Sequence, residues 1–194
     1  MVARALFVMV MAVLLVGCGG PDDEVPVFSA TTSQPVSSTT TPVPTLEGAS
    51  TDPVVSDGGA TETALLTDVR AARHAGYDRV VFEFRNGVPG YGVRYVEPPV
   101  RADGSGAEVT VAGGAVLLVR MEPALDADLS QESAPRTYTG PTRFSPDTAA
   151  IVELVRSGGF EAVLTWAAGV DEERPFRVTR LENPARIVLD ISSP

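Results

Sequence analysis

The sequence predicts an all-β fold, a two-sheet β-sandwich with one short helix inserted near residues 146–157. Three observations lead to this fold class. Apolar and polar side chains alternate over several short segments, and turns rich in glycine and proline separate those segments. The segments fall within residues 63–194, a length that suits one domain with one core. Short strands at this spacing are typical of a sandwich or a barrel, and we favour the sandwich.

The clearest expected strand is residues 79–85, which read Arg-Val-Val-Phe-Glu-Phe-Arg. Alternation places Val80, Phe82 and Phe84 on one face, and we expect these three in the core together with Ile187 and Leu189. An Asn-Gly turn signal follows, and residues 91–96 repeat the alternation. The other expected strands are residues 66–72, 107–112, 115–121, 160–167, 176–181 and 186–191.

The expected helix begins at residues 145–148, Ser-Pro-Asp-Thr, which offer an N-cap, a proline at the first helical position and an acid in the first turn. Ile151, Leu154 and Val155 then fall at helical spacing, and two glycines at 158–159 would end the helix. We expect this helix to cap an open end of the sandwich core.

The N-terminal residues 1–17 are typical of a secretory signal peptide, with Arg4 followed by an apolar run that is short for a membrane span. The segment Leu-Val-Gly-Cys that ends at Cys18 resembles a bacterial lipobox. This resemblance implies that Cys18 carries acyl chains such as palmitate, becomes the mature N-terminus and anchors the protein to the outer face of the cell membrane.

Residues 18–62 are expected to form the lipidated cysteine and a disordered tether. The stretch from residue 19 to residue 62 holds six prolines, a Ser/Thr run at 37–41 and a single aromatic residue, Phe28. Such a composition buries too little apolar surface to offset the entropy of ordering. The folded domain is therefore expected at residues 63–194.

Composition excludes several function classes. The net charge is −10, so electrostatic binding of nucleic acid is not expected. All 15 basic residues are Arg, and there is one His and one Cys, so lysine chemistry and a Cys/His zinc site are also excluded. We expect no metal and no cofactor, and with no nucleophile motif beside the single His we do not expect an enzyme.

Two passages carry a family resemblance. Residues 66–84 read LTDVRAARHAGYDRVVFEF and residues 176–191 read FRVTRLENPARIVLDI. They resemble the opening and closing parts of an AMIN-like domain of lipoproteins from high-GC Gram-positive bacteria, a distant relative of the AMIN domain. AMIN domains are β-sandwich modules that localise several cell-wall amidases by binding peptidoglycan, so the resemblance implies a wall-binding or targeting module.

The candidate binding surface consists of polar residues near the first strands and on the last strand: Arg70, His74, Tyr77, Asp78, Arg79 and Arg186. His74 is expected in a turn, where it would donate a hydrogen bond to a sugar or peptide. Arg186 and Asp190 are expected on the outward face of the last strand. The pattern leaves open whether they pair with a neighbouring strand or present a binding surface.

Other residues offer weaker alternatives. Asp126 with Asp128, and the acids at 171–173, are expected to be solvated surface rather than a glycosidase pair. Trp166 and Phe160 are candidates for stacking on a sugar, although Trp166 is better explained as core. Residues 102–106 lack the spaced acids of a calcium loop and are expected to form a hairpin turn.

The resulting expectation is a membrane-anchored envelope lipoprotein whose domain binds peptidoglycan or another wall glycan without catalysis. The alternative is a docking domain for another envelope protein. Because the domain is itself mildly acidic, we expect binding through hydrogen bonds and stacking rather than net charge.

Overall fold

The structure, a computed structural model, describes residues 46–194, which lie within one compact unit. Its secondary structure is entirely β, so the all-β prediction is confirmed for this part of the chain. The thirteen strands are β1 (Val54–Ser56), β2 (Ala64–His74), β3 (Tyr77–Arg85), β4 (Gly90–Val96), β5 (Val100–Arg101), β6 (Glu108–Val109), β7 (Ala115–Glu122), β8 (Ala124–Leu125), β9 (Arg143–Phe144), β10 (Ile151–Phe160), β11 (Val163–Val170), β12 (Phe176–Glu182) and β13 (Ala185–Ser192).

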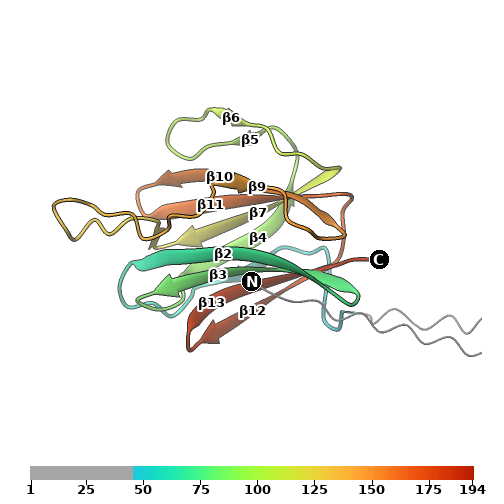
Figure 1. Cartoon of the computed structure of the whole chain (residues 1–194), viewed down its shortest axis with the longest axis horizontal. Coiled ribbons are helices and arrows are strands. Elements are labelled where there is room, and N and C mark those ends of the chain that lie inside the picture. Colours follow the sequence, from blue (N-terminus) through green and yellow to red (C-terminus); the bar gives the residue numbers. More distant parts are fainter. Residues whose placement is uncertain (1–45) are drawn as a thin grey trace, which may run out of the picture. The chain divides into compact units, whose positions relative to one another are not determined.

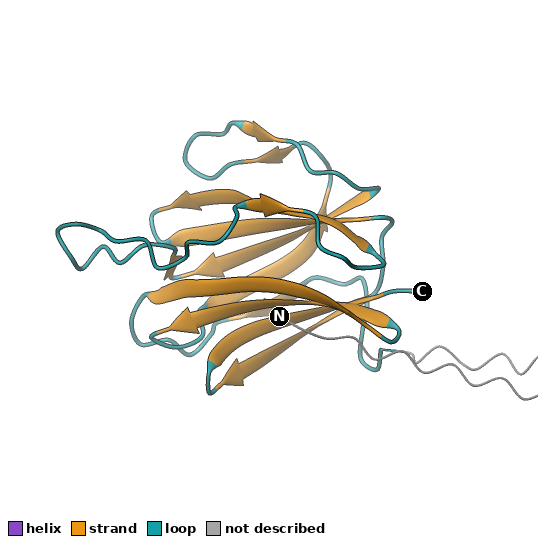
Figure 2. Ribbon diagram, in the orientation of Figure 1, coloured by secondary structure: helices purple, strands orange, loops and turns teal. Residues whose placement is uncertain are grey.

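Two large sheets form the sandwich (Figures 1 and 2). The six-stranded sheet has the order β1-β4-β7-β11-β10-β9, and the five-stranded sheet has the order β12-β13-β3-β2-β8. Every pair in them is antiparallel except β2 with β8. The small hairpin β5–β6 lies outside the six-stranded sheet, at the top of Figure 1.

The core lies between the two large sheets. Trp166 of β11 is completely buried, and its ring meets Phe82 and Tyr138 edge-on at centroid distances of 6.0 and 5.8 Å. The five side chains that the sequence placed in the core are all buried: Val80, Phe82, Phe84, Ile187 and Leu189. The strand phases predicted from alternation are therefore correct for β3 and β13.

A second, smaller apolar cluster fixes the β5–β6 hairpin against the six-stranded sheet. Val100 packs in it with Val116 and Ala167. At the tip of the hairpin, the Thr165 hydroxyl donates a hydrogen bond to the Asp103 carboxylate. The hairpin turn expected at residues 102–106 is confirmed, and it covers part of this sheet's outer face.

The predicted helix at residues 146–157 is wrong, because the described residues contain no helix and Ile151–Phe160 is strand β10. Its pairing with β11 is irregular between Ile151 and Glu153 and between Arg156 and Gly158. A bulge adds one residue to a strand and shifts the alternation by one position. Ile151 and Leu154 consequently both reach the core, which imitates the three-residue spacing of a helix.

The ordered domain begins earlier than the expected residue 63. Strand β1 lies within the stretch assigned to the tether and pairs with β4, where Val54 packs against the core. A strand of only three residues forms here because β4 of the sheet supplies its hydrogen-bonding partner. Cys18 and the expected signal peptide lie outside the described residues. Among residues 46–194, no helix has the length and apolar character needed to cross a membrane.

Candidate functional site

The outer face of the five-stranded sheet gathers five of the six candidate binding residues. Strand register places His74 opposite Tyr77 and Arg186 opposite Glu83, while Arg70 and Arg79 lie on the same side of the sheet. We call this surface the arginine face. Its residues are Asp68, Arg70, His74, Tyr77, Arg79, Glu83, Arg177, Arg186 and Asp190.

The centre of the arginine face is a cross-strand ion-pair ladder. Arg79 Nε and Nη2 donate to the two oxygens of Asp190 at 2.6 and 2.9 Å, and Arg177 Nη2 donates to Asp190 Oδ2 at 2.8 Å. Burial by itself would raise the pKa of Asp190, but the two guanidinium groups outweigh burial and hold that pKa below its ordinary value. Of the two roles left open for Asp190, the structure shows pairing with neighbouring strands.

Two valines occupy the middle of the same face. Val81 and Val188 point outward by register, opposite each other, yet both are buried. Arg70 lies opposite Val81 on the adjacent strand. Long polar side chains on this face therefore also cover apolar surface, which is a structural role for arginine stems.

The aromatic end of the face lies at the β2–β3 turn. The His74 and Tyr77 rings stack at a centroid distance of 4.8 Å with an angle of 12° between their planes. The Arg79 guanidinium carbon lies 5.2 Å from the centroid of the Tyr77 ring. His74 ends strand β2 and is the exposed member of this trio, as expected for a residue at a turn.

The other two arginines of this face, Arg70 and Arg186, differ in how many ion pairs they form. Arg70 donates to Asp68 at 2.6 Å and to Glu83 at 3.1 Å, and all three side chains remain partly exposed. Among the described residues Arg186 forms no ion pair, and its Nε donates only to the carbonyl of Pro184, at 3.3 Å. His74 and Arg186 are consequently the groups on this face best placed to meet a ligand.

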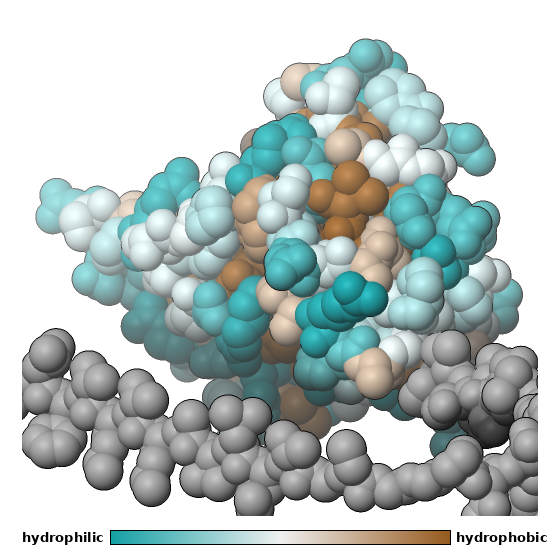
Figure 3. Space-filling view, turned by 45° about the vertical axis from the view of Figure 1, so that its right-hand side comes forward, coloured by the Kyte–Doolittle hydropathy of each residue, from teal (hydrophilic) through white to brown (hydrophobic). Residues whose placement is uncertain are grey.

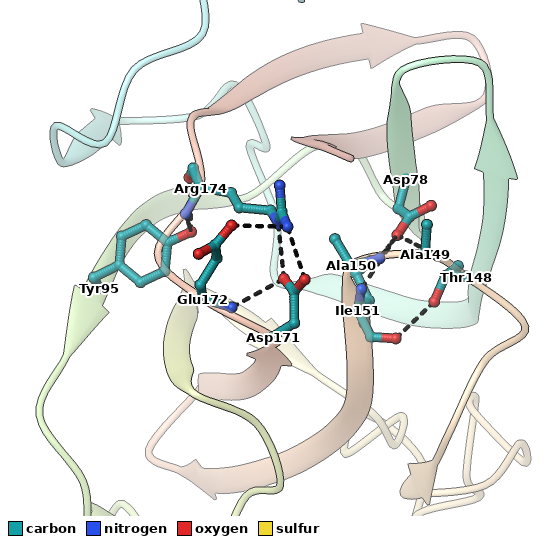
Figure 4. Close-up of polar contacts among 9 residues, drawn as sticks. All are labelled: Asp78, Tyr95, Thr148, Ala149, Ala150, Ile151, Asp171, Glu172 and Arg174. Carbon is teal, nitrogen blue, oxygen red and sulfur yellow. Dashed lines mark hydrogen bonds and ion pairs between the residues drawn. The ribbon is translucent and has the colours of Figure 1, made fainter. Parts of the chain in front are cut away.

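Asp78 is the exception, because it is completely buried and its placement on the surface is wrong. Figure 4 shows its Oδ2 accepting hydrogen bonds from the backbone N–H groups of Ala149, Ala150 and Ile151, at 2.9, 2.6 and 3.2 Å. The carboxylate thereby joins β3 to the segment that leads into β10. Period-two alternation already puts Asp78 on the same side as Val80, and this signal would have identified it as inward-facing.

A second polar cluster lies beside this link, at the start of the β11–β12 loop (Figure 4). Arg174 binds both carboxylate oxygens of Asp171 at 2.7 and 2.8 Å and pairs with Glu172 at 2.9 Å. The hydrogen bond from Arg174 lowers the pKa of Asp171. The Tyr95 hydroxyl donates to the Arg174 carbonyl at 2.7 Å and accepts from its N–H at 2.9 Å, while burial raises the pKa of Tyr95.

The carboxylates considered as a glycosidase pair have other partners. Asp126 is buried, not solvated as expected, and binds Arg136 at 3.2 Å and Arg156 at 2.8 Å. Asp128 accepts from Ser130 and Gln131 within its own loop. In the described part of the chain, no three side chains of His, Cys, Asp or Glu are arranged to hold a metal ion.

Trp166 and Phe160, the two candidates for stacking on a sugar, differ in burial. Trp166 lies in the core, as the alternation of its strand indicates. Phe160 is half exposed at the end of β10 and belongs to that strand rather than to the next one. Figure 3 shows that hydrophobic surface on the side facing the reader is restricted to small patches between polar side chains.

Comparison with known proteins gives one match. The family model of the AMIN-like domain matches residues 64–193. No curated protein and no solved structure matches the chain. The matched residues run from the start of β2 to one residue beyond the end of β13 and so contain every residue of the arginine face.

Proposed function

Because the chain belongs to the AMIN-like domain family, we propose that it is a non-catalytic module of the cell envelope that binds peptidoglycan or another wall glycan. The family match over residues 64–193 is the observation that carries this proposal. The arginine face supports it through His74, which is exposed, and Arg186, which forms no ion pair with the described residues.

The chemistry of this face suits a weakly charged polymer. Its four arginines stand beside three carboxylates, and Asp190 alone engages two of the arginines. Net charge therefore contributes little attraction, and hydrogen bonds from groups such as His74 and Arg186 have to supply the affinity. Binding of this kind depends only weakly on salt, because screening acts mainly on exposed, separated charges.

Lipid attachment at Cys18 is the second part of the proposal, and it would hold the domain at the outer face of the membrane. The support is the signal-like sequence of residues 1–17 and the lipobox resemblance ending at Cys18. Cys18→Ala is expected to release the protein into the soluble fraction or to leave the signal uncleaved. A Cys18→Ala protein that is processed and retained at the membrane like wild type would contradict it.

Retention of the full chain on insoluble peptidoglycan, at low and at high salt, tests the wall-binding function. We expect retention that survives high salt and falls with His74→Ala, Tyr77→Ala, Arg70→Gln and Arg186→Gln. Arg79→Gln also breaks the pair with Asp190, so its unfolding midpoint is measured alongside. Arg101→Gln is the matched control, because Arg101 is an exposed arginine on the β5–β6 hairpin. Absence of retention at both salt concentrations would overturn the proposal.

A docking domain for another envelope protein is the second candidate, and one observation favours it. Leu129 and Phe160 are 63% and 51% exposed and line the same hollow, where the loop after β8 projects from the sandwich. Exposed apolar side chains that lie together mark protein interaction sites. Cross-linking in cells that traps one envelope protein, and is lost with Leu129→Ser and Phe160→Ser but not with His74→Ala, would select this function.

A further inference from the structure

The outer face of the six-stranded sheet holds a hollow at the edge away from the β5–β6 hairpin. A row of directly paired residues crosses it, with Gly92 of β4 between Val55 of β1 and Arg120 of β7. The hollow has a volume of about 400 Å³. We call it the Gly92 hollow, and its lining residues are Val55, Ser56, Asp57, Gly90, Tyr91, Gly92, Arg120 and Glu122.

Two glycines of β4 lie in this hollow for different reasons. At Gly90 a β-carbon would lie 2.7 Å from the carbonyl oxygen of Glu122 and 3.0 Å from that of Asp57, so close backbone packing requires glycine there. At Gly92 a β-carbon would meet no described atom within 4 Å apart from its chain neighbours, and φ is not in the left-handed region. Neither packing nor backbone conformation accounts for Gly92.

A glycine in the interior of a strand costs roughly 0.5–1 kcal/mol relative to alanine, and it often marks close approach of a ligand or another backbone. At Gly92 the described residues provide no such neighbour. The open space thus points to an occupant that is not part of residues 46–194.

The walls of the hollow combine apolar and polar groups. Val55 is 77% exposed and offers an apolar side. On the opposite side Arg120 and Glu122 form an ion pair at 2.5 Å, with both side chains about half exposed, and Asp57 lies at the end. Guanidinium donors and carboxylate acceptors therefore stand within reach of one bound ring.

We propose that the Gly92 hollow binds one neutral sugar ring of a glycan chain. The C–H face of the ring lies over Gly92 and against Val55, and its hydroxyl edge bonds Arg120, Glu122 and Asp57. The volume lies within the range usual for small-ligand sites. This inference extends the proposed wall binding to a second surface, on the other sheet from the arginine face.

An added peptide strand suits the hollow less well. β1 forms this edge of the sheet and is only three residues long, so it offers few backbone groups for strand addition. The mixed polarity of the walls matches a ring that carries both C–H groups and hydroxyls.

Substitutions that add a side chain at position 92 fill the hollow and so test whether a sugar binds there. The probe is the soluble β-1,4-linked tetramer of N-acetylglucosamine, titrated by calorimetry into the full chain purified in detergent. We expect Gly92→Ala to weaken binding about threefold and Gly92→Val at least tenfold, while both variants keep the wild-type melting temperature or exceed it. Arg120→Gln is expected to weaken binding about tenfold. Ala107→Val, which adds a similar side chain at an exposed position on the hairpin, serves as the matched control and is expected to bind like wild type.

The outcomes separate this inference from the proposed function. Gly92→Val that binds the tetramer as tightly as wild type overturns the hollow as a sugar site. A wild-type protein that is retained on peptidoglycan but does not bind the tetramer also overturns it, and leaves wall binding standing. A protein that binds the tetramer in a Gly92-dependent way but is not retained on peptidoglycan supports the hollow and overturns the wall-binding proposal.

Discussion

The outer faces of the two sheets both carry paired charges, but they differ in how much space their own side chains leave open. On the arginine face, Asp190 is bound by Arg79 and Arg177, and Arg70 is bound by Asp68 and Glu83. On the other sheet, the β5–β6 hairpin covers one part with an apolar cluster, while the Gly92 hollow leaves another part open. One face is filled by its own side chains, and the other contains space that they do not fill.

This difference teaches that a dense set of polar residues is not by itself evidence of a binding site. Charged side chains that pair across strands stabilise the sheet and have fewer hydrogen bonds left for a ligand. At the Gly92 hollow Arg120 and Glu122 are also paired with each other, but the unfilled space beside them lets a ligand reach their exposed atoms. Single substitutions on both faces test this difference, and the buried Asp78, which faces the core instead of the arginine face, has the largest expected effect.

Asp78→Ala is expected to give the largest effect, a loss of about 2–4 kcal/mol in the free energy of unfolding. The substitution leaves three backbone N–H groups without their acceptor, and each unmet buried donor costs roughly 1–3 kcal/mol. Removing a buried charge offsets part of that cost. Denaturant unfolding measures the change.

Asp78→Asn is the control that keeps the side-chain shape, since its amide oxygen can still accept hydrogen bonds. We expect it to lose about half as much free energy of unfolding as Asp78→Ala. A change below about 0.5 kcal/mol in Asp78→Ala would return Asp78 to the surface and restore it to the set of candidate binding residues.

The sequence predicted most of the sandwich but not its irregular parts. Regular alternation identified β3 and β13 together with their inward residues, because a strand without bulges keeps period two along its whole length. The bulges of β10 break that period, and the Ser-Pro-Asp segment before it has the composition of a helix start. Of the four two-residue strands only β6 falls in a predicted strand, since β5, β8 and β9 carry too few residues for any period to show.

Asp190→Asn is expected to cost about 1.5–3 kcal/mol at pH 7, the range for hydrogen bonds to charged groups. The folded-state pKa of Asp190 lies below its ordinary value, so its ionised form contributes stability above the unfolded pKa of about 4. That contribution is lost as the pH falls through the lower, folded-state pKa. The difference between wild type and Asp190→Asn should therefore shrink below about pH 4.

Glu108→Gln provides the exposed counterpart, because its pair with Arg101 leaves both side chains more than half exposed. We expect a loss of at most about 0.5 kcal/mol for it. Equal losses in the two variants, or a loss in Asp190→Asn that is constant from pH 7 to pH 3, would show that the ladder is no more than a surface ion pair.

The candidate site was harder to predict than the fold, since it depends on which strands are neighbours. His74, Tyr77 and Arg79 are close in sequence, so local spacing was enough to group them. The ladder joins Arg79 to Asp190 and Arg177, more than 90 residues away, and only the register of β3, β13 and β12 reveals it. The Gly92 hollow has no sequence signal at all, because a glycine required by packing and one facing open space look the same.

Substitution of those two glycines distinguishes them by the sign of the change in the free energy of unfolding. Gly92→Ala is expected to stabilise the domain by about 0.5–1 kcal/mol, because it lowers the entropy of the unfolded chain and meets no neighbour in the fold. Gly90→Ala is expected to destabilise it by about 1–3 kcal/mol, because its β-carbon would press on the backbone oxygens of Glu122 and Asp57. Both values come from thermal or denaturant unfolding. A destabilised Gly92→Ala would mean that the fold itself requires this glycine, and the main reason for expecting a ligand above it would disappear.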